Sequence, residues 1–227
     1  MLGTIVNFFS IIVGSLLGLV FKKGMPERIN ETIMSGLALC VLLIGVSGTL
    51  KSQNILLIIF SIVIGGIAGE LVNIDKLLNN LGDFIEGKLK GKGNVSEGFV
   101  TASLLYCVGA MAIVGSLQSG LEGNHKILFA KSILDGVSAI IFSSTLGIGV
   151  VFSAFSVLIY QGLITLMASF LKPLLVTATI NEMTAVGSLL IIGLSFNMLK
   201  ISKIKVANLL PAVIIPILYQ VVLNFIK

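Results

Sequence analysis

The feature that most constrains the fold of this chain is a series of long uncharged windows. Each is about as long as the roughly 20 residues that a membrane-spanning helix requires, or longer. Hydrophobic side chains make up 56% of the 227 residues and charged side chains only 11%. Too little polar surface is left to cover a water-soluble core, so the composition indicates a membrane protein. The windows are residues 2–21, 32–50, 52–69, 98–121, 136–171, 183–199 and 206–226.

The window at residues 136–171 holds 36 residues, nearly enough for two spans, so we count about eight spanning helices. Backbone groups find no water in hydrocarbon, so only helices and closed barrels can cross it. Continuous apolarity without period-two alternation excludes the barrel. The sequence therefore predicts an all-α, polytopic transmembrane helical bundle that forms a single integral membrane domain over residues 1–227. No basic segment precedes residues 2–21, which we interpret as a retained helix.

The only long polar segment, residues 73–95, has leucines and isoleucines at helical spacing opposite charged side chains. This pattern predicts an amphipathic helix lying on the membrane surface. If the chain crosses eight times, ten of the 15 basic residues fall on the same side as this segment. Cytoplasmic loops are enriched in lysine and arginine, so we expect the helix at residues 73–95 to be cytoplasmic.

A short motif occurs twice at matching places in the hydropathy pattern. Residues 29–31 and residues 180–182 both read Ile-Asn-Glu, and each is followed at the same spacing by Gly36 or Gly187. The match maps helices 1–3 onto helices 6–8, and a shift of five helices reverses their direction. This predicts an inverted repeat, which many secondary transporters contain. The alternative, that both Asn-Glu pairs only cap helices, remains open.

Ionisable side chains within spans are the candidate functional residues, because each costs at least about 2.5–3.5 kcal/mol to insert. Asp135 is the strongest candidate and is expected to bind or relay a cation. Lys131 lies one helical turn before it and can neutralise it, which would make the pair structural instead. Glu70 can likewise be a surface carboxylate at the end of the third helix.

Hydroxyls follow Asp135 along the same segment, and glycines are expected to break that helix near Gly147-Gly149 after only about 22 Å. Irregular backbone at such depth must be buried in protein or line a wet cavity. We therefore expect a polar translocation site there. The ion- or substrate-binding candidates are Asp135, Ser138, Ser143, Ser144, Thr145, Glu70, Gln118, Gln161, Glu97, Glu182 and Asn7, with Lys131 as the charge partner.

The residues needed for enzyme chemistry are missing from the sequence. His125 is the sole histidine, and no Cys/His cluster could hold zinc. Residues 82–88 approach a phosphate-binding loop, but Leu89 stands where a hydroxyl is required. We expect no enzyme activity, no cofactor and no nucleic-acid partner.

Seven stretches of this chain resemble the YdfK/YqgA-like family of bacterial inner-membrane proteins. The resemblance implies a multi-pass protein of the bacterial plasma membrane with a transport role, but it supplies no binding residues. In that family proline often occupies the position of Ala110, which leaves a break in the fourth helix open. The stretches are residues 3–7 (GTIVN), 65–70 (GGIAGE), 98–116 (GFVTASLLYCVGAMAIVGS), 130–139 (AKSILDGVSA), 146–154 (LGIGVVFSA), 160–162 (YQG) and 208–212 (NLLPA).

The leading functional prediction is a secondary transporter or permease for a small ion or metabolite, coupled to H⁺ or Na⁺ through intramembrane carboxylates. The alternatives are an oligomeric ion channel and a membrane scaffold without transport activity. The expected partners are membrane lipid, the transported solute and further copies of the chain. A water-accessible Asp135 would favour transport, whereas an Asp135 sealed against Lys131 would favour a scaffold.

Overall fold

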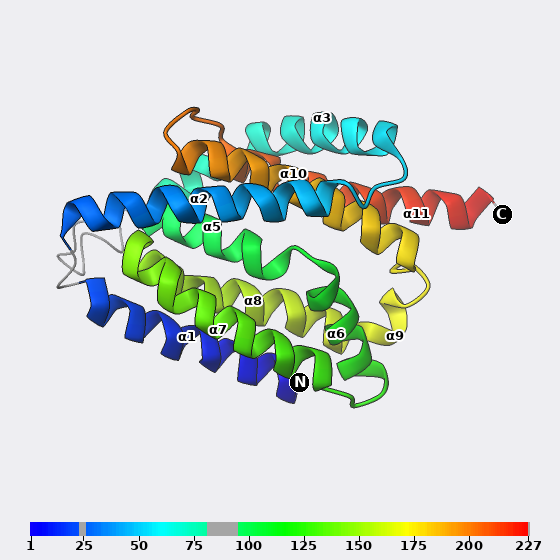
Figure 1. Cartoon of the computed structure of the whole chain (residues 1–227). Helices are drawn as coiled ribbons and strands as arrows, with labels where there is room; N and C mark the ends of the chain where they lie inside the picture. Colours follow the sequence, from blue (N-terminus) through cyan, green and yellow to red (C-terminus); the bar gives the residue numbers. More distant parts are fainter. Residues whose placement is uncertain (23–25, 81–94, 227) are drawn as a thin grey trace. The chain divides into compact units, whose positions relative to one another are not determined.

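The computed structural model describes residues 1–22, 26–80 and 95–226, and every regular element in these ranges is a helix (Figure 1). The all-α prediction is therefore confirmed. The helices form two compact units. Unit 1 comprises residues 1–34, 78–107 and 111–169, and unit 2 comprises residues 35–77, 108–110 and 170–227.

Most helices lie wholly, or nearly so, within either unit 1 or unit 2. Unit 1 contains α1 (Leu2–Lys22), α5 (Val95–Cys107), nearly all of α6 (Ala110–Leu121), α7 (Lys126–Leu146) and α8 (Gly149–Leu166). Unit 2 contains α3 (Ile55–Val72), α10 (Thr177–Met198), the 3₁₀-helix η1 (Val206–Ile214) and α11 (Ile215–Ile226). Two helices, α2 (Glu27–Thr49) and the short α9 (Ala168–Leu171), have residues in both units.

Within the described ranges, seven helices are long and apolar enough to cross a membrane. An eighth crossing results if α5 and α6, which meet at a bend of 60°, form one broken span. These helices overlap the uncharged windows of the sequence. The structure is therefore consistent with a polytopic helical bundle of about eight spans.

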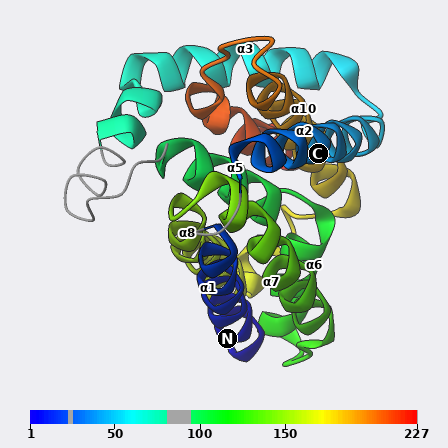
Figure 2. The ribbon, with the colours of Figure 1, turned by 60° about the vertical axis from the view of Figure 1, so that its left-hand side comes forward.

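Small residues let α1 and α7 approach closely in unit 1. A side chain on Gly14 would collide with the carbonyl of Gly136, and one on Gly18 would collide with that of Ile140. The two helices therefore run in the same direction with their backbones in contact, as small residues spaced four apart permit in membranes. In Figure 2, α1, α7 and α8 lie together, in agreement with their mutual contacts.

Glycines also allow α3 and η1 to pack closely in unit 2. Gly65 faces the backbone of Ala212, and Gly69 faces the carbonyl of Asn208, so these two segments run antiparallel. Pro211 lies inside η1 and removes a backbone donor, which suits a 3₁₀-helix better than a continuous α-helix. Residues of α3, α10 and η1 form the apolar core between them: Ile58, Ala185, Val186 and Ala212.

The structure has the expected break near Gly147-Gly149, but the break separates two full-length helices, α7 and α8. Gly147 does end α7, with a φ of 83°. However, α7 begins at Lys126 and has 21 residues, about 31 Å, so the prediction that this helix is too short to cross was wrong. Asn124 receives a hydrogen bond from the Lys126 amide and helps to start the helix early. Gly147 therefore lies in a turn between two complete spans, α7 and α8.

The broken helix lies instead between α5 and α6. The bend falls at Val108 and Gly109, and Gly109 has a φ of 133°, which side-chain-bearing residues rarely adopt. Glycine thus marks the bend between α5 and α6, although the chain has alanine at position 110.

Two predictions are left largely untested. Residues 74–80 are helical, as expected for the start of the amphipathic helix over residues 73–95, but residues 81–94 lie outside the described part of the chain. The inverted repeat of helices 1–3 and 6–8 stays a prediction.

Candidate ion-binding site

A buried ion pair is the centre of the candidate site in unit 1. Lys131 and Asp135 lie one turn apart on α7, with 2.9 Å between the lysine Nζ and the carboxylate Oδ1. Their side chains are only 9% and 7% exposed. Two charges at this depth are costly unless they are paired. The pairing explains how α7 can carry both within a span.

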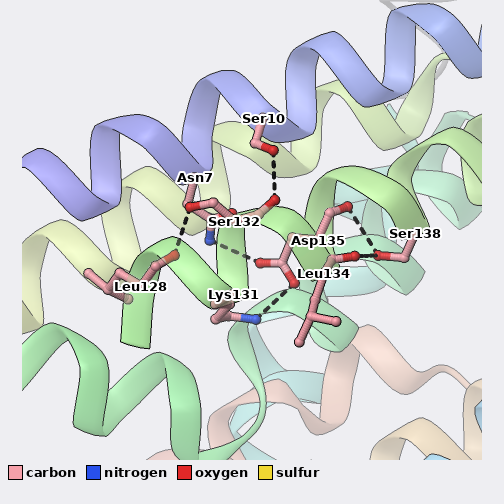
Figure 3. A network of polar contacts seen from close by, with 8 residues as sticks. All are labelled: Asn7, Ser10, Leu128, Lys131, Ser132, Leu134, Asp135 and Ser138. Atoms are coloured by element: carbon pink, nitrogen blue, oxygen red, sulfur yellow. Dashed lines mark hydrogen bonds and ion pairs between the residues drawn. The ribbon is translucent and has the colours of Figure 1, made fainter. Parts of the chain in front are cut away.

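The second oxygen of the carboxylate is held by α1. Asn7 donates from Nδ2 to Asp135 Oδ2 over 2.9 Å (Figure 3). The Oδ1 atom of Asn7 is buried and has no hydrogen-bond partner among the described residues. An acceptor therefore remains beside the carboxylate, on the same side chain that holds it in place.

Serines tie α1 and α7 together around this network. Ser10 donates to the Ser132 carbonyl over 2.6 Å, and Ser132 donates to the Leu128 carbonyl over 2.7 Å (Figure 3). The Ser10 bond crosses from α1 to α7, whereas the Ser132 bond stays within α7. The Ser10 bond helps to fix the register of α1 on α7, which brings Asn7 to Asp135.

The broken span lies next to the ion pair. Tyr106 and Cys107 end α5, and both lie within electrostatic reach of Asp135. Cys107 is also within reach of Lys131. The last carbonyls of α5 have no partners within that helix, and they carry the negative end of its dipole. A lysine or a bound cation is therefore favoured beside them.

Further buried polar atoms in unit 1 have no hydrogen-bond partner among the described residues. On α8, the side-chain nitrogen and oxygen of Gln161 both lack a partner of this kind, and Gln161 is fully buried. Such atoms cost roughly 1–3 kcal/mol each unless water or a solute bonds to them. Unit 1 is thus unusually polar for a helical bundle in lipid. The other side chains of this kind in α1, α5, α6 and α8 include Thr4, Ser15, Thr101, Ser116 and Thr165.

The structure does not bring the predicted hydroxyls to Asp135. Ser143 donates to the Gly147 carbonyl, Ser144 to that of Ile141, and Thr145 to those of Ile141 and Phe142. Ser143 lies about 12 Å along α7 from Asp135, at 1.5 Å per residue. Ser138 is closer, but it donates to the carbonyls of Leu134 and Asp135 (Figure 3). In a regular helix these hydroxyls bond to their own backbone.

Three other candidates lie apart from this network. Glu70 accepts hydrogen bonds from Lys205 at 2.8 Å and from Asn208 at 2.5 Å, and the Lys205 and Glu70 side chains are 57% and 56% exposed. The Glu70 carboxylate raises the pKa of Lys205 through this bond. Glu70 is therefore a surface carboxylate, which was the alternative interpretation from the sequence. Glu97 lies in the first turn of α5 and Gln118 near the end of α6, both half-buried.

Glu182 is buried in unit 2. Its carboxylate accepts from the Ser52 hydroxyl at 2.5 Å and from the Gln53 amide at 2.9 Å. These contacts connect α10 to the turn before α3. The site residues that the structure does bring together are thus Asn7, Lys131 and Asp135. Tyr106 and Cys107, which are not among the predicted binding candidates, are their neighbours.

Repeated apolar helices around a buried charge network define a polytopic integral membrane protein. The chain belongs to the family described as "Protein of unknown function (DUF554)", whose model matches residues 2–221. It is 34% identical over 220 residues to "Uncharacterized membrane protein YdfK" of Bacillus subtilis (strain 168), with 95% of this chain and 94% of the relative covered. It is 27% identical over 220 residues to "Uncharacterized protein YqgA" of Escherichia coli (strain K12), with 94% of both covered. No solved structure matches this chain. The resemblance noted from the sequence is thereby confirmed.

Proposed function

We propose that this protein is a secondary transporter or permease of the bacterial plasma membrane that moves a small ion or metabolite with H⁺ or Na⁺. One observation supports this above all. A carboxylate, an ammonium group and an amide are buried together in unit 1, beside a broken span. Ionisable residues inside membrane proteins commonly mark ion pathways, and broken helices commonly form the binding sites of transporters.

Lys131 keeps the site neutral. An unpaired Asp135 would be a costly charge in a bilayer, and the lysine ammonium donates to its Oδ1. The lysine side chain has a flexible four-carbon stem and can turn from the carboxylate towards the last carbonyls of α5, where the helix dipole favours a cation. A proton or sodium ion then takes its place at Asp135, with the Asn7 oxygen as a neutral ligand.

A second candidate function, a membrane scaffold, is favoured by how closed the network is. Asp135 is only 5% exposed, and both its oxygens already accept hydrogen bonds from Asn7 and Lys131. In a scaffold the pair would only join α1 to α7. The two functions differ in what happens when both charges are removed together.

The test uses purified protein in liposomes. Fluxes of monovalent cations and amino acids are screened with and without a proton gradient, for the parent chain and for Asp135→Asn, Lys131→Met and the double variant. Glu122→Gln, in an exposed loop after α6, is the control. We expect a flux in the parent and the control that falls by more than tenfold in all three variants. A double variant that folds and keeps the parent flux would refute the role of the pair in transport, and a parent without any flux would refute the transport function.

A further inference from the structure

A cavity of about 210 Å³ opens in unit 2 among α3, α10, α11 and the turn before α3. Every residue that lines it belongs to unit 2, whereas Asn7, Lys131 and Asp135 belong to unit 1. It is therefore a separate feature from the candidate ion-binding site. Its volume is below the 300–1,000 Å³ typical of drug-sized ligands, so it suits a smaller molecule.

Glu182 brings a charge to this cavity. The residue is 8% exposed, and in the described ranges it has no lysine, arginine or histidine within ion-pair distance. It is the sixth residue of α10, beyond the first turn where the helix dipole stabilises an anion most. Among the described residues the buried carboxylate therefore forms no ion pair.

The carboxylate still has room for a further donor. Ser52 and Gln53 supply one hydrogen bond to each of its oxygens. An ionised carboxylate has about four acceptor positions. Roughly half of its capacity therefore remains for a ligand that carries N–H donors and a positive charge.

The rest of the lining indicates what kind of cation would fit. Leu57, Pro216 and Leu223 supply apolar walls, and Tyr219 supplies an aromatic ring. The other polar side chains of the lining are neutral amides and a hydroxyl, among them Asn54, Asn181 and Gln220. Calcium and magnesium sites surround the ion with about six or more oxygen ligands on all sides, whereas this lining is polar in one part and apolar in another. An ammonium group with an attached alkyl chain matches both parts, and the Tyr219 ring can also attract the cation.

We propose that this cavity binds a small organic ammonium ion, with the Glu182 carboxylate as its anionic partner. The Thr179 hydroxyl donates to the Gln220 side-chain oxygen over 3.4 Å, which places two further polar groups together on the lining. The apolar walls hold the alkyl part. This site goes beyond the proposed function, since it involves none of the residues that carry the transport proposal.

The competing explanation is structural: Glu182 orders the turn before α3 through Ser52 and Gln53. Two variants separate the explanations. Glu182→Gln removes the charge but keeps a side-chain acceptor for that turn. Leu223→Trp narrows the cavity but leaves Glu182 and its two hydrogen bonds in place.

The experiment is calorimetric titration of the purified full chain in detergent with n-butylammonium chloride at constant ionic strength. We expect saturable binding by the parent and by the control Glu122→Gln, and at least about tenfold weaker binding by Glu182→Gln, equivalent to about 1.4 kcal/mol or more. Leu223→Trp should weaken binding by a similar factor. Circular dichroism and gel filtration check that each variant is folded.

Several outcomes would overturn the proposal: a parent that does not bind, or a folded Glu182→Gln or Leu223→Trp that binds like the parent. Displacement of n-butylammonium by sodium but not by a second alkylammonium would assign the site to an inorganic cation instead, and would also overturn it. The titration measures binding at residues of unit 2 and requires no flux. Failure of the transport test therefore leaves this test valid, and the reverse also holds.

Discussion

Replacing Asp135 with asparagine is expected to destabilise the protein strongly, because it leaves the Lys131 ammonium buried without its counter-charge. Replacing Lys131 with methionine leaves the carboxylate in the same position, held only by Asn7. In the double variant both charges are gone, and Asn7 can still bond to the new amide. The double variant should therefore be more stable than the two single variants would suggest.

The distance in the pair sets the size of the effect. At 2.9 Å between Nζ and Oδ1, two unit charges attract each other by about 6 kcal/mol if the effective dielectric constant is about 20. Local rearrangement recovers part of this in a single variant. Measured losses of one partner from a buried pair are about 3–5 kcal/mol, whereas removal of both partners is often nearly neutral. We expect a coupling energy of about 3 kcal/mol or more.

The assay is reversible unfolding in mixed micelles, followed by circular dichroism, for the parent, both single variants and the double variant. The coupling energy is the difference between the effect of the double variant and the sum of the single effects. Lys126→Met, an exposed lysine at the start of α7, is the control and should change the unfolding free energy little. Additive effects in the double variant would refute the stabilising pair.

Three further predictions concern packing, backbone strain and surface charge. Gly14→Leu should lower the free energy of unfolding by about 1–3 kcal/mol, because its side chain meets the Gly136 carbonyl; unchanged unfolding in micelles would contradict this contact. Gly109→Ala should cost about 1–3 kcal/mol in the same assay, because its φ of 133° strains any side-chain-bearing residue. Glu70→Gln should lower the pKa of Lys205 towards the ordinary value of about 10.4, which NMR titration of its Nζ can measure. In the parent the pair is intact at neutral pH, and on the alkaline side it is lost as the pH rises through the raised lysine pKa.

The number and kind of helices could be predicted because hydropathy is a local property of each span. The window at residues 136–171 was correctly divided into two helices at Gly147. The start of α7 could not be placed, because the charges of Lys131 and Asp135 lie just before the uncharged window at residues 136–171. Their mutual pairing lets the helix extend back to Lys126.

The break between α5 and α6 carried a weaker signal. Only a glycine marks it, and the chain has 25 glycines, most of which lie in continuous helices or loops. What distinguishes Gly109 is its backbone conformation, which depends on tertiary packing rather than on the neighbouring letters.

The candidate site was predictable only where its contacts are local. Lys131 and Asp135 are four residues apart and meet on any helix. Asn7 is 128 residues from Asp135, and its position depends on the register of α1 against α7. Ser144 and Thr145 bond to the carbonyl of Ile141 and not to Asp135, because a hydroxyl in a regular helix can bond to its own backbone.

The low hydropathy and high burial of α10 affect how the protein is inserted into the membrane. This helix is the least apolar and the most enclosed of the described spans, and its buried hydroxyls include Thr184 and Ser195. A helix of this kind enters lipid poorly alone, so it should wait at the translocon until the following η1 and α11 are synthesised and can cover it. A nascent chain that stops before residue 206 would then leave α10 poorly inserted and open to membrane proteases.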